Sequence, residues 1–418
     1  MSGKKFTRFG PVAAEWPIIR LREVIRERAK WIEIDDNTLY QRVTARVRNQ
    51  GIEPRDRVLG SYVKTKRQKL CKADDLLVAE IDAKVGGFGL VPTEGDGAIV
   101  SGHYFLFEID RAHVALNWLD HVIRDGRLQR QVDAVGSTNY AAIRPRDVGA
   151  FQMPLPPLAE QRAIAEVLGA VEEAIAKTGA LIEALAKSRI ELTRDFQGGE
   201  EQLRWPLRSI GSLVRQCQYG LSIPLDGEGK VPVLRMPDIG DGRVNVNVGT
   251  LKSTDVTPAE IASCAIREGD ILFNRTNSQA LVGKTGIVRN TPSTQIVFAS
   301  YLIRLVAKTG VNPFWLNGVL NLPRTQERLK TLATPGVSQW NINSKTLKRF
   351  EIVVPPKADQ DQFADLYEAI ETRLDAERAK LNATLEVRAA LAQELLSGRI
   401  RLPESIIARH RDKAGRAA

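Results

Sequence analysis

Two long stretches of the chain place apolar residues at the spacing of a coiled-coil helix. Each begins after a proline pair, at residues 156–157 and 355–356, and then runs for more than forty residues without another proline. Proline suits the first turn of a helix, because its missing N–H would have no partner there. The apolar residues return at alternating steps of four and three, which indicates a coiled-coil seam rather than the wider face of a globular helix. We therefore predict long helices over residues 156–203 and 355–402.

The two predicted seams correspond to one another. The seam of the first helix contains Ile164, Leu168, Val171, Ile175, Ile182 and Leu185. The first seam continues to Leu192 and Phe196, and adding 199 to its positions generates the second seam, whose apolar members include Phe363, Ile370, Leu374, Leu381, Leu391 and Leu395. An antiparallel pairing in which facing residue numbers sum to 559 brings seam positions together, as for Ile164 and Leu395. We therefore predict an antiparallel coiled coil. The alternative is two unrelated amphipathic helices, each packed on its neighbouring globular part.

The correspondence extends beyond the helices to the whole chain. "EWPIIRLREVI" near the start matches "RWPLRSIGSLV", and "CKADDLLVAEI" matches "IREGDILFNRT", which places Asp75 over Asp270. Units as large as these are duplicated domains, because the repeats of a solenoid are far shorter. Each unit consists of a globular part, with short β-branched and aromatic runs typical of strands, followed by the long helix.

The predicted fold is therefore α/β (α+β), with two similar globular domains, an antiparallel coiled coil of two long helices and an internal pseudo-twofold repeat. The first globular domain covers residues 1–155 and is followed by the central helix, 156–203. The second covers residues 204–354 and is followed by the C-terminal helix, 355–402. A basic tail, residues 403–418, is expected to be flexible.

Charge is unevenly distributed between the globular parts and the helices. The chain has 60 basic and 50 acidic residues, and its net charge is +10. The basic excess lies in the globular parts, whereas each helix has slightly more acidic than basic residues. This distribution suggests that the globular parts face a polyanion such as nucleic acid, while the helices face protein. The alternative is a basic surface that has no binding role.

Polar loops supply candidate contacts to nucleic acid. Cations can bind phosphates, and Arg, Asn and Gln side chains can also make bidentate contacts to bases. In the first globular part the candidates are Lys64, Lys66, Arg67, Lys69, Lys84, Ser137, Asn139 and Tyr140. In the second globular part they are Arg275, Asn277, Gln279, Lys284, Ser338, Gln339 and Trp340. Each loop has a second interpretation, as a solvated or purely structural turn.

No catalytic or metal-binding arrangement is found in the sequence. "VGKTG" resembles the end of a phosphate-binding loop, but Ser278 stands where the first glycine of that motif is required. The four histidines and three cysteines lack the spacing of metal ligands or disulfides, which fits a reducing cytosol. No apolar run suits a signal peptide or a membrane span. We therefore expect a cytoplasmic binding protein with no catalytic residue, metal or cofactor of its own.

Several segments resemble the specificity subunit of type I restriction–modification systems. The most specific is "STNYAAIRP" followed by "PLPPLAEQ", which leads into the first long helix. The second helix starts with a related segment, "PPKADQ". Together with the two basic globular halves, the resemblance covers essentially the whole chain.

The resemblance implies a function that the residues alone do not. Each globular part would be a target recognition domain that reads one half of a split, asymmetric site in double-stranded DNA. The helices would hold these domains at a fixed distance and dock two methyltransferase subunits, which bind S-adenosylmethionine and methylate adenine. Two restriction subunits, which use ATP with magnesium, would complete the endonuclease. The chain itself would catalyse nothing.

Two other classes of function stay open at this point. A duplicated coiled-coil adaptor that binds only proteins would have the same helices and an incidental positive charge. Binding to DNA with a preferred sequence and a steep salt dependence would argue against it. An enzyme that acts on nucleic acid by itself is disfavoured by the missing motifs, and methyl transfer or cleavage by the chain alone would favour it.

Overall fold

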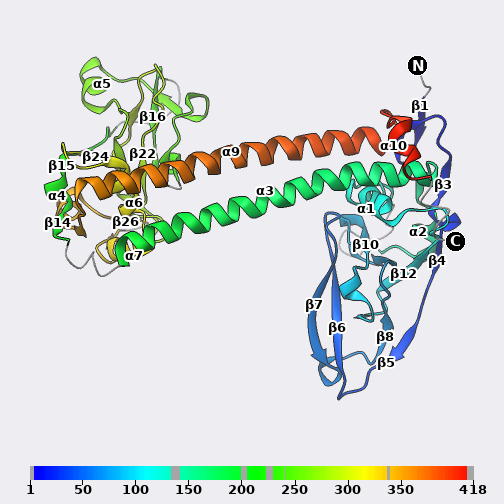
Figure 1. Ribbon diagram of the computed structural model, residues 1–418. Coiled ribbons are helices and arrows are strands. Elements are labelled where there is room, and N and C mark those ends of the chain that lie inside the picture. Colours follow the sequence, from blue (N-terminus) through cyan, green and yellow to red (C-terminus); the bar gives the residue numbers. More distant parts are fainter. Residues whose placement is uncertain are drawn as a thin grey trace. The chain divides into compact units, whose positions relative to one another are not determined.

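A computed structural model describes residues 4–132, 142–198, 205–222, 229–240, 242–336 and 339–411. The chain forms two compact units, the first made of Met1–Thr178 and Lys380–Ala418, the second of Gly179–Ala379. Each unit therefore combines one globular part with portions of both long helices, α3 (Leu158–Gly198) and α9 (Lys357–Leu395) (Figure 1). Both long helices that the seam pattern predicts are confirmed.

The first unit contains two main sheets and two short strand pairs. The four-stranded sheet has the order β10 (Phe88–Leu90), β9 (Leu76–Ala79), β12 (Tyr104–Ile109) and β4 (Ile25–Glu27). The five-stranded sheet has the order β5 (Trp31–Glu33), β8 (Arg67–Leu70), β11 (Ile99–Val100), β6 (Leu39–Arg46) and β7 (Gly51–Leu59). The pairs are β1 (Lys4–Thr7) with β2 (Gly10–Ala13), and β13 (Gln152–Pro154) with β3 (Ile18–Arg20). The short helices are α1 (Leu116–Arg124), α2 (Pro145–Gly149) and α10 (Glu404–Ala408).

The second unit is built around a six-stranded sheet. Its order is β15 (Val214–Tyr219), β24 (Leu302–Ala307), β20 (Ile271–Asn274), β22 (Thr285–Ile287), β18 (Arg243–Val244) and β17 (Ile239–Gly240). The smaller sheets are β19 (Lys252–Thr254), β16 (Val231–Leu234) and β23 (Val297–Phe298); β21 (Thr276–Asn277), β26 (Trp340–Asn341) and β25 (Thr334–Pro335); and β14 (Leu207–Ser209) with β27 (Glu351–Val353). The short helices are α4 (Ile210–Leu213), α5 (Pro258–Cys264), α6 (Pro313–Leu320), α7 (Pro323–Thr331) and α8 (Ser344–Arg349).

The internal repeat is visible in individual hydrogen bonds. Gln161 of α3 donates from Nε2 to the Pro156 carbonyl at 2.8 Å and accepts from the Ala115 amide at 2.8 Å. The residue 199 positions later, Gln360 of α9, donates to the Pro355 carbonyl at 2.9 Å and accepts from the Asn312 amide at 2.9 Å. Each glutamine therefore ties the start of a long helix to the segment before a short one, which explains why both helices begin with the same motif.

The coiled-coil seam lies where the sequence predicts it. Ile164, Leu168, Phe363, Leu374 and Leu395 are each at most 2% exposed. The other seven predicted seam residues are half-buried, and none is exposed. An apolar stripe of this kind on each helix holds the two long helices together, because a helix in a protein gains most of its stability by packing its apolar face.

One ion pair between α3 and α9 in each unit reports the direction and register of the two helices. In the first unit, Arg388 Nη2 lies 2.7 Å from Glu172 Oε1, and in the second, Arg189 Nη1 lies 2.8 Å from Glu371 Oε1. The facing residue numbers sum to 560 in both pairs, one away from the predicted register. The two pairs are also copies of one another, since Glu172 and Arg189 become Glu371 and Arg388 after a shift of 199. The helices are therefore antiparallel and related by the pseudo-twofold repeat.

The expectation of a flexible tail from residue 403 is wrong for the part that the structure describes. Helix α10 follows α9 and packs on the first unit, with Ile407 and His410 each 7% exposed. His410 Nε2 lies 2.7 Å from Glu166. Just before α10, Arg401 Nη2 lies 2.8 Å from the buried carboxylate of Glu160. These contacts anchor the segment up to residue 411, and residues 412–418 lie outside the described residues.

Among the residues that the structure describes, no helix combines the length and the apolar composition needed to cross a membrane. The two compact units divide the chain inside the long helices and not at the ends of the globular parts. The predicted boundaries at residues 155, 203, 354 and 402 therefore stay predictions.

Candidate nucleic-acid interface

Two loops that the sequence singled out meet in one small sheet of the second unit. Strand β21 pairs with β26 in an antiparallel ladder that places Asn277 opposite Trp340. The Ile342 amide also donates to the Arg275 carbonyl at 2.9 Å. The candidates Arg275, Asn277 and Trp340 therefore lie side by side, although they come from distant parts of the sequence.

The Arg275 side chain is half-buried and held in one orientation. Its guanidinium lies 4.8 Å from the centre of the Tyr219 ring. Nη1 donates to the Ser300 carbonyl at 3.1 Å, and Nη2 donates to Asn341 Oδ1 at 3.2 Å. A base contact by Arg275 would have to use its remaining donors or replace one of these bonds, so its direct role in reading bases stays a prediction.

The other candidates of this interface differ in how accessible they are. Gln279 is exposed, whereas Asn277 and Gln339 are half-buried, and Asn277 Oδ1 accepts from the Ser278 amide at 2.8 Å. Lys284 is half-buried and borders a cavity of about 340 Å³ that is also lined by Lys330. Ser338 lies outside the described residues. Gln279 is thus the candidate of this interface that is most open to a ligand.

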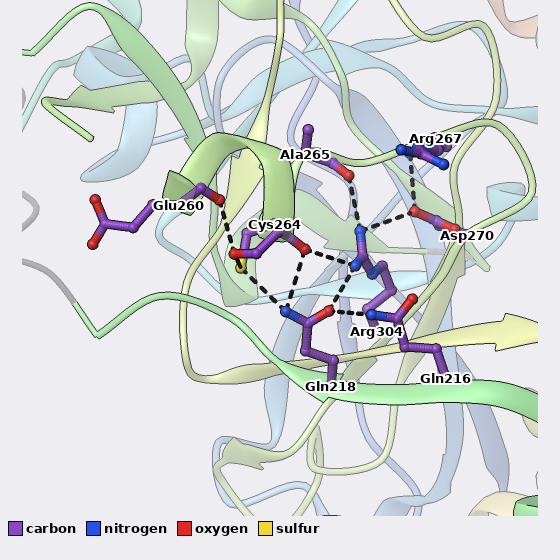
Figure 2. A network of polar contacts seen from close by, with 9 residues as sticks. Gln216, Gln218, Glu260, Cys264, Ala265, Arg267, Asp270 and Arg304 are labelled. Carbon is purple, nitrogen blue, oxygen red and sulfur yellow. Dashed lines mark hydrogen bonds and ion pairs between the residues drawn. The ribbon is translucent and has the colours of Figure 1, made fainter. Parts of the chain in front are cut away.

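A buried arginine supports the sheet behind this interface. Figure 2 shows Arg304, on β24, reaching toward the end of helix α5. Its Nη1 and Nη2 donate to the carbonyls of Ala265 and Ser263, both at 2.8 Å, and Nη2 also donates to Gln218 Oε1 at 2.6 Å. Carbonyls at the end of a helix lack intrahelical partners, so a guanidinium there satisfies them and favours the helix dipole. Arg304 therefore joins α5 to the six-stranded sheet.

The two repeats use different arginines beside equivalent carboxylates. Asp75 and Asp270 are 3% and 4% exposed, and burial raises the pKa of each carboxyl group. Asp270 has Arg304 of β24 at 3.6 Å, whereas Asp75 forms an ion pair with Arg28, which follows β4. The buried acid is thus kept in both repeats, but its partner comes from a different strand.

In the first unit the predicted basic run splits into surface and interior positions. Lys64 and Arg67 are exposed, and the Arg67 guanidinium lies 4.7 Å from the centre of the Trp31 ring. Lys66 forms an ion pair with Asp36 and donates to the Gly60 carbonyl at 2.7 Å. Lys64 and Arg67 are therefore the positions of this run most accessible to DNA.

Lys69 is not a surface residue. It is 5% exposed, and its Nζ donates to the carbonyls of Tyr104 at 2.6 Å and Gly102 at 3.3 Å. Burial lowers the pKa of its ammonium group, because a charge in the interior loses its hydration. Lys69 lies on the same face of β8 as Arg67 but is covered by the rings of Trp31 and Phe105, which lie 5.2 and 5.1 Å from its Nζ. The structure therefore gives Lys69 a structural role, and a contact with phosphate stays a prediction.

The remaining candidates of the first unit are dispersed. Lys84 is exposed on the short 3-10 helix Asp82–Val85. Ser137, Asn139 and Tyr140 lie outside the described residues. The sequence reasoning missed Tyr62, whose relative exposure of 77% is the largest among the exposed large hydrophobic residues. Its position two residues before Lys64 was the available signal, because aromatic residues next to cations are typical of nucleic-acid surfaces.

The described residues contain no group of three or more His, Cys, Asp or Glu side chains that could hold a metal ion. The cysteines Cys71, Cys217 and Cys264 are all free thiols.

Comparison with known proteins identifies the class of this interface. Residues 211–387 match the family model of the type I restriction modification DNA specificity domain. Most of the second globular part and much of α9 therefore resemble a DNA specificity domain of type I restriction–modification systems, in agreement with the sequence resemblance.

Curated relatives show the same resemblance, and a solved structure shares the fold. The chain is 22% identical to the EcoKI specificity subunit of Escherichia coli K12 over 67% of this chain and 64% of that protein. It is 26% identical to the putative MjaX specificity subunit of Methanocaldococcus jannaschii over 40% of each. The match thus spans less than two thirds of either relative's length. The type I S subunit from M. genitalium shares the fold, with a TM-score of 0.59 and 14% identity over 91% of this chain and 96% of that one.

Proposed function

We propose that this chain is the DNA-reading subunit of a type I restriction–modification complex and catalyses nothing itself. Each globular part reads one half of a split, asymmetric site in double-stranded DNA. The observation that carries the proposal is the match of residues 211–387 to a DNA specificity domain, in a chain whose two units repeat one plan and share the equivalent ion pairs Glu172–Arg388 and Glu371–Arg189. Two related recognition domains with different polar loops suit a DNA site that has two different halves.

The partners follow from the same reasoning. DNA is the ligand of the basic globular parts, since protein cations gain free energy by releasing counterions from the duplex. Two methyltransferase subunits dock on the long helices and bring S-adenosylmethionine to the target adenines. Two restriction subunits bring ATP and magnesium, so this chain needs no cofactor, and the complex works in the cytoplasm. The support for this proposal is that the relatives named above are specificity subunits of type I restriction enzymes.

The long helices suit the role of a spacer. The predicted seam from Ile164 to Phe196 gives a rod of roughly 50 Å at ~1.5 Å per residue. Duplex DNA rises ~3.4 Å per base pair, so a rod of this length corresponds to about 15 base pairs. The spacer therefore sets the gap between the two half-sites.

Deletion of one heptad from both helices tests the proposal. The deletions Glu173–Gly179 and Thr372–Arg378 remove repeat-related segments and keep the seam in phase. A map of methylated adenines should then show the same two half-sites with a shorter gap. An unchanged gap contradicts the spacer, and the absence of sequence-specific DNA binding at any salt concentration favours the protein-only adaptor.

A further inference from the structure

One end of the first globular part carries an unusually exposed aromatic residue. Two loops meet there: residues 34–38, which join β5 to β6, and residues 60–66, which join β7 to β8. We call these two loops the aromatic tip. Figure 1 shows the tip in dark blue at the end of these strands that points away from α1. Tyr62 lies in the 3-10 helix Gly60–Tyr62 of the tip and is 77% exposed.

The backbone of the aromatic tip is locked by contacts between its two loops. The Gly60 amide donates to the Thr38 carbonyl at 2.9 Å, and the Ser61 amide donates to the Asp36 carbonyl at 3.1 Å. A Cβ atom on Gly60 would lie 1.9 Å from the Asp35 carbonyl oxygen, so only glycine allows the loops to approach this closely. The tip therefore presents Tyr62 on a rigid frame.

Side chains of the tip also hold its two loops together. Lys66 bridges the loops through its ion pair with Asp36 and its bond to the Gly60 carbonyl. The Asp35 carboxylate accepts from the Asn37 amide at 2.9 Å and from Thr38 Oγ1 at 3.0 Å. The polar groups of the loops are thus used to hold the loops themselves, which leaves the Tyr62 ring as their outward feature.

Exposed apolar residues and charged residues lie in and beside the aromatic tip, the acidic ones being Asp35, Asp36 and Asp56. Leu39 and Leu59 pair with one another at the ends of β6 and β7 and are 55% and 42% exposed. Residues 55–67 include five basic side chains and one acidic one. An aromatic ring amid cations fits a nucleic acid, in which phosphates surround stacked bases, better than it fits a neutral protein surface.

We propose that the aromatic tip is a DNA-contacting element in which Tyr62 packs its ring against bases of the first half-site and Lys64 binds an adjacent phosphate. This inference rests on the proposed function. A tyrosine has only two side-chain torsions to fix, so a ring held outward by a rigid loop loses little entropy on binding. Its apolar ring can press on a base step or on a thymine methyl group, which makes Tyr62 a specificity-determining residue.

The test uses the full chain with its methyltransferase partner and a sequencing readout of methylated adenine. The variants are Tyr62→Ala, Tyr62→Phe and Lys64→Ala, with Leu207→Ala as a control at a 60%-exposed apolar residue of the second unit. Tyr62→Ala should lower methylation of the cognate site about tenfold or more and relax base choice in one half-site only. Tyr62→Phe should keep the preference, because the ring remains. Lys64→Ala should weaken all sites equally.

The outcomes separate this inference from the function beneath it. A split motif from the unmodified chain that Tyr62→Ala leaves unchanged overturns the inference alone. Size-exclusion chromatography could also show that Tyr62→Ala no longer binds the methyltransferase, while an excess of methyltransferase restores the same methylated motif. That result would assign the tip to a protein partner and would also overturn the inference. No split motif from the unmodified chain overturns the proposed function and the inference together.

Discussion

The repeat-related ion pairs Glu371–Arg189 and Glu172–Arg388 allow a buried and a partly exposed form of one interaction to be compared in the same molecule. Glu371 and Glu172 occupy equivalent positions and face equivalent arginines. The Glu371 side chain is 2% exposed and contacts both Arg189 at 2.8 Å and Arg243 at 2.7 Å. The Glu172 side chain is 37% exposed. Replacing each glutamate by glutamine removes the charge and keeps the shape.

The two replacements should differ in their effect on the free energy of unfolding. Glu371→Gln leaves two guanidinium groups beside a buried neutral amide, and breaking a buried ion pair costs about 3–5 kcal/mol. The arginines retain some exposure and Arg243 still contacts Asp375, so we expect the lower end, about 3 kcal/mol. Water screens the more exposed pair, so Glu172→Gln should cost about 1 kcal/mol or less.

Hydrogen exchange measured by mass spectrometry suits this comparison, because it reports opening of each unit separately. Glu371→Gln should accelerate exchange in α6 and in the α9 segment of the second unit, and Glu172→Gln should change α1 only slightly. A double-mutant cycle with Arg189→Met isolates the coupling of the buried pair. Equal effects of the two replacements, or a loss below about 1 kcal/mol for Glu371→Gln, would refute the reasoning from burial.

Three further predictions concern single residues. The pKa of Glu172 is lowered from 4.5 to about 2, chiefly by its contact with His121, so its contribution to stability is present above pH 4.5 and is lost as the pH falls toward 2. Water screens this 37%-exposed carboxylate, so the contribution stays within the about 1 kcal/mol expected for Glu172→Gln. Acid unfolding of the first unit should therefore flatten in Glu172→Gln, and an unchanged acid profile would contradict this. Gly60→Ala should destabilise the aromatic tip by at least about 2 kcal/mol, seen as faster exchange in residues 34–38, whereas a crystal structure with an undisturbed tip would count against the close approach of its two loops. Arg304→Lys removes the planar fork that caps α5, so limited proteolysis should cut near α5 at least several-fold faster than in the unmodified chain. An unchanged cleavage rate there would show that Arg304 does not hold the helix.

The long helices and their antiparallel pairing could be predicted, with a register one residue away from the observed one, because their pattern is local and repeated. A seam of twelve apolar positions constrains both helices, and the shift of 199 converts Glu172 and Arg189 into Glu371 and Arg388, so that it generates both ion pairs from one set of positions. Period and repeat are properties of the sequence itself, so no knowledge of tertiary contacts was needed.

The interface was harder to predict because it depends on contacts between distant segments. The run at residues 64–69 has four cations, and only the tertiary contacts of Lys69 with Phe105 and the Tyr104 carbonyl show that it is buried while Arg67 is exposed. The pairing of β21 with β26 likewise joins segments whose sequences contain no signal for one another. The order of the tail up to residue 411 depends on the buried acid Glu160, which is far away in the sequence.

The central claim is that the two globular parts read two half-sites at a fixed separation. Sequencing of methylated adenine in DNA from cells that carry this chain with its methyltransferase partner tests it most directly. The account predicts one split, asymmetric motif with a constant gap, in which both half-sites appear together. A complex that forms normally but produces no new methylated motif, or a single continuous one, would contradict it.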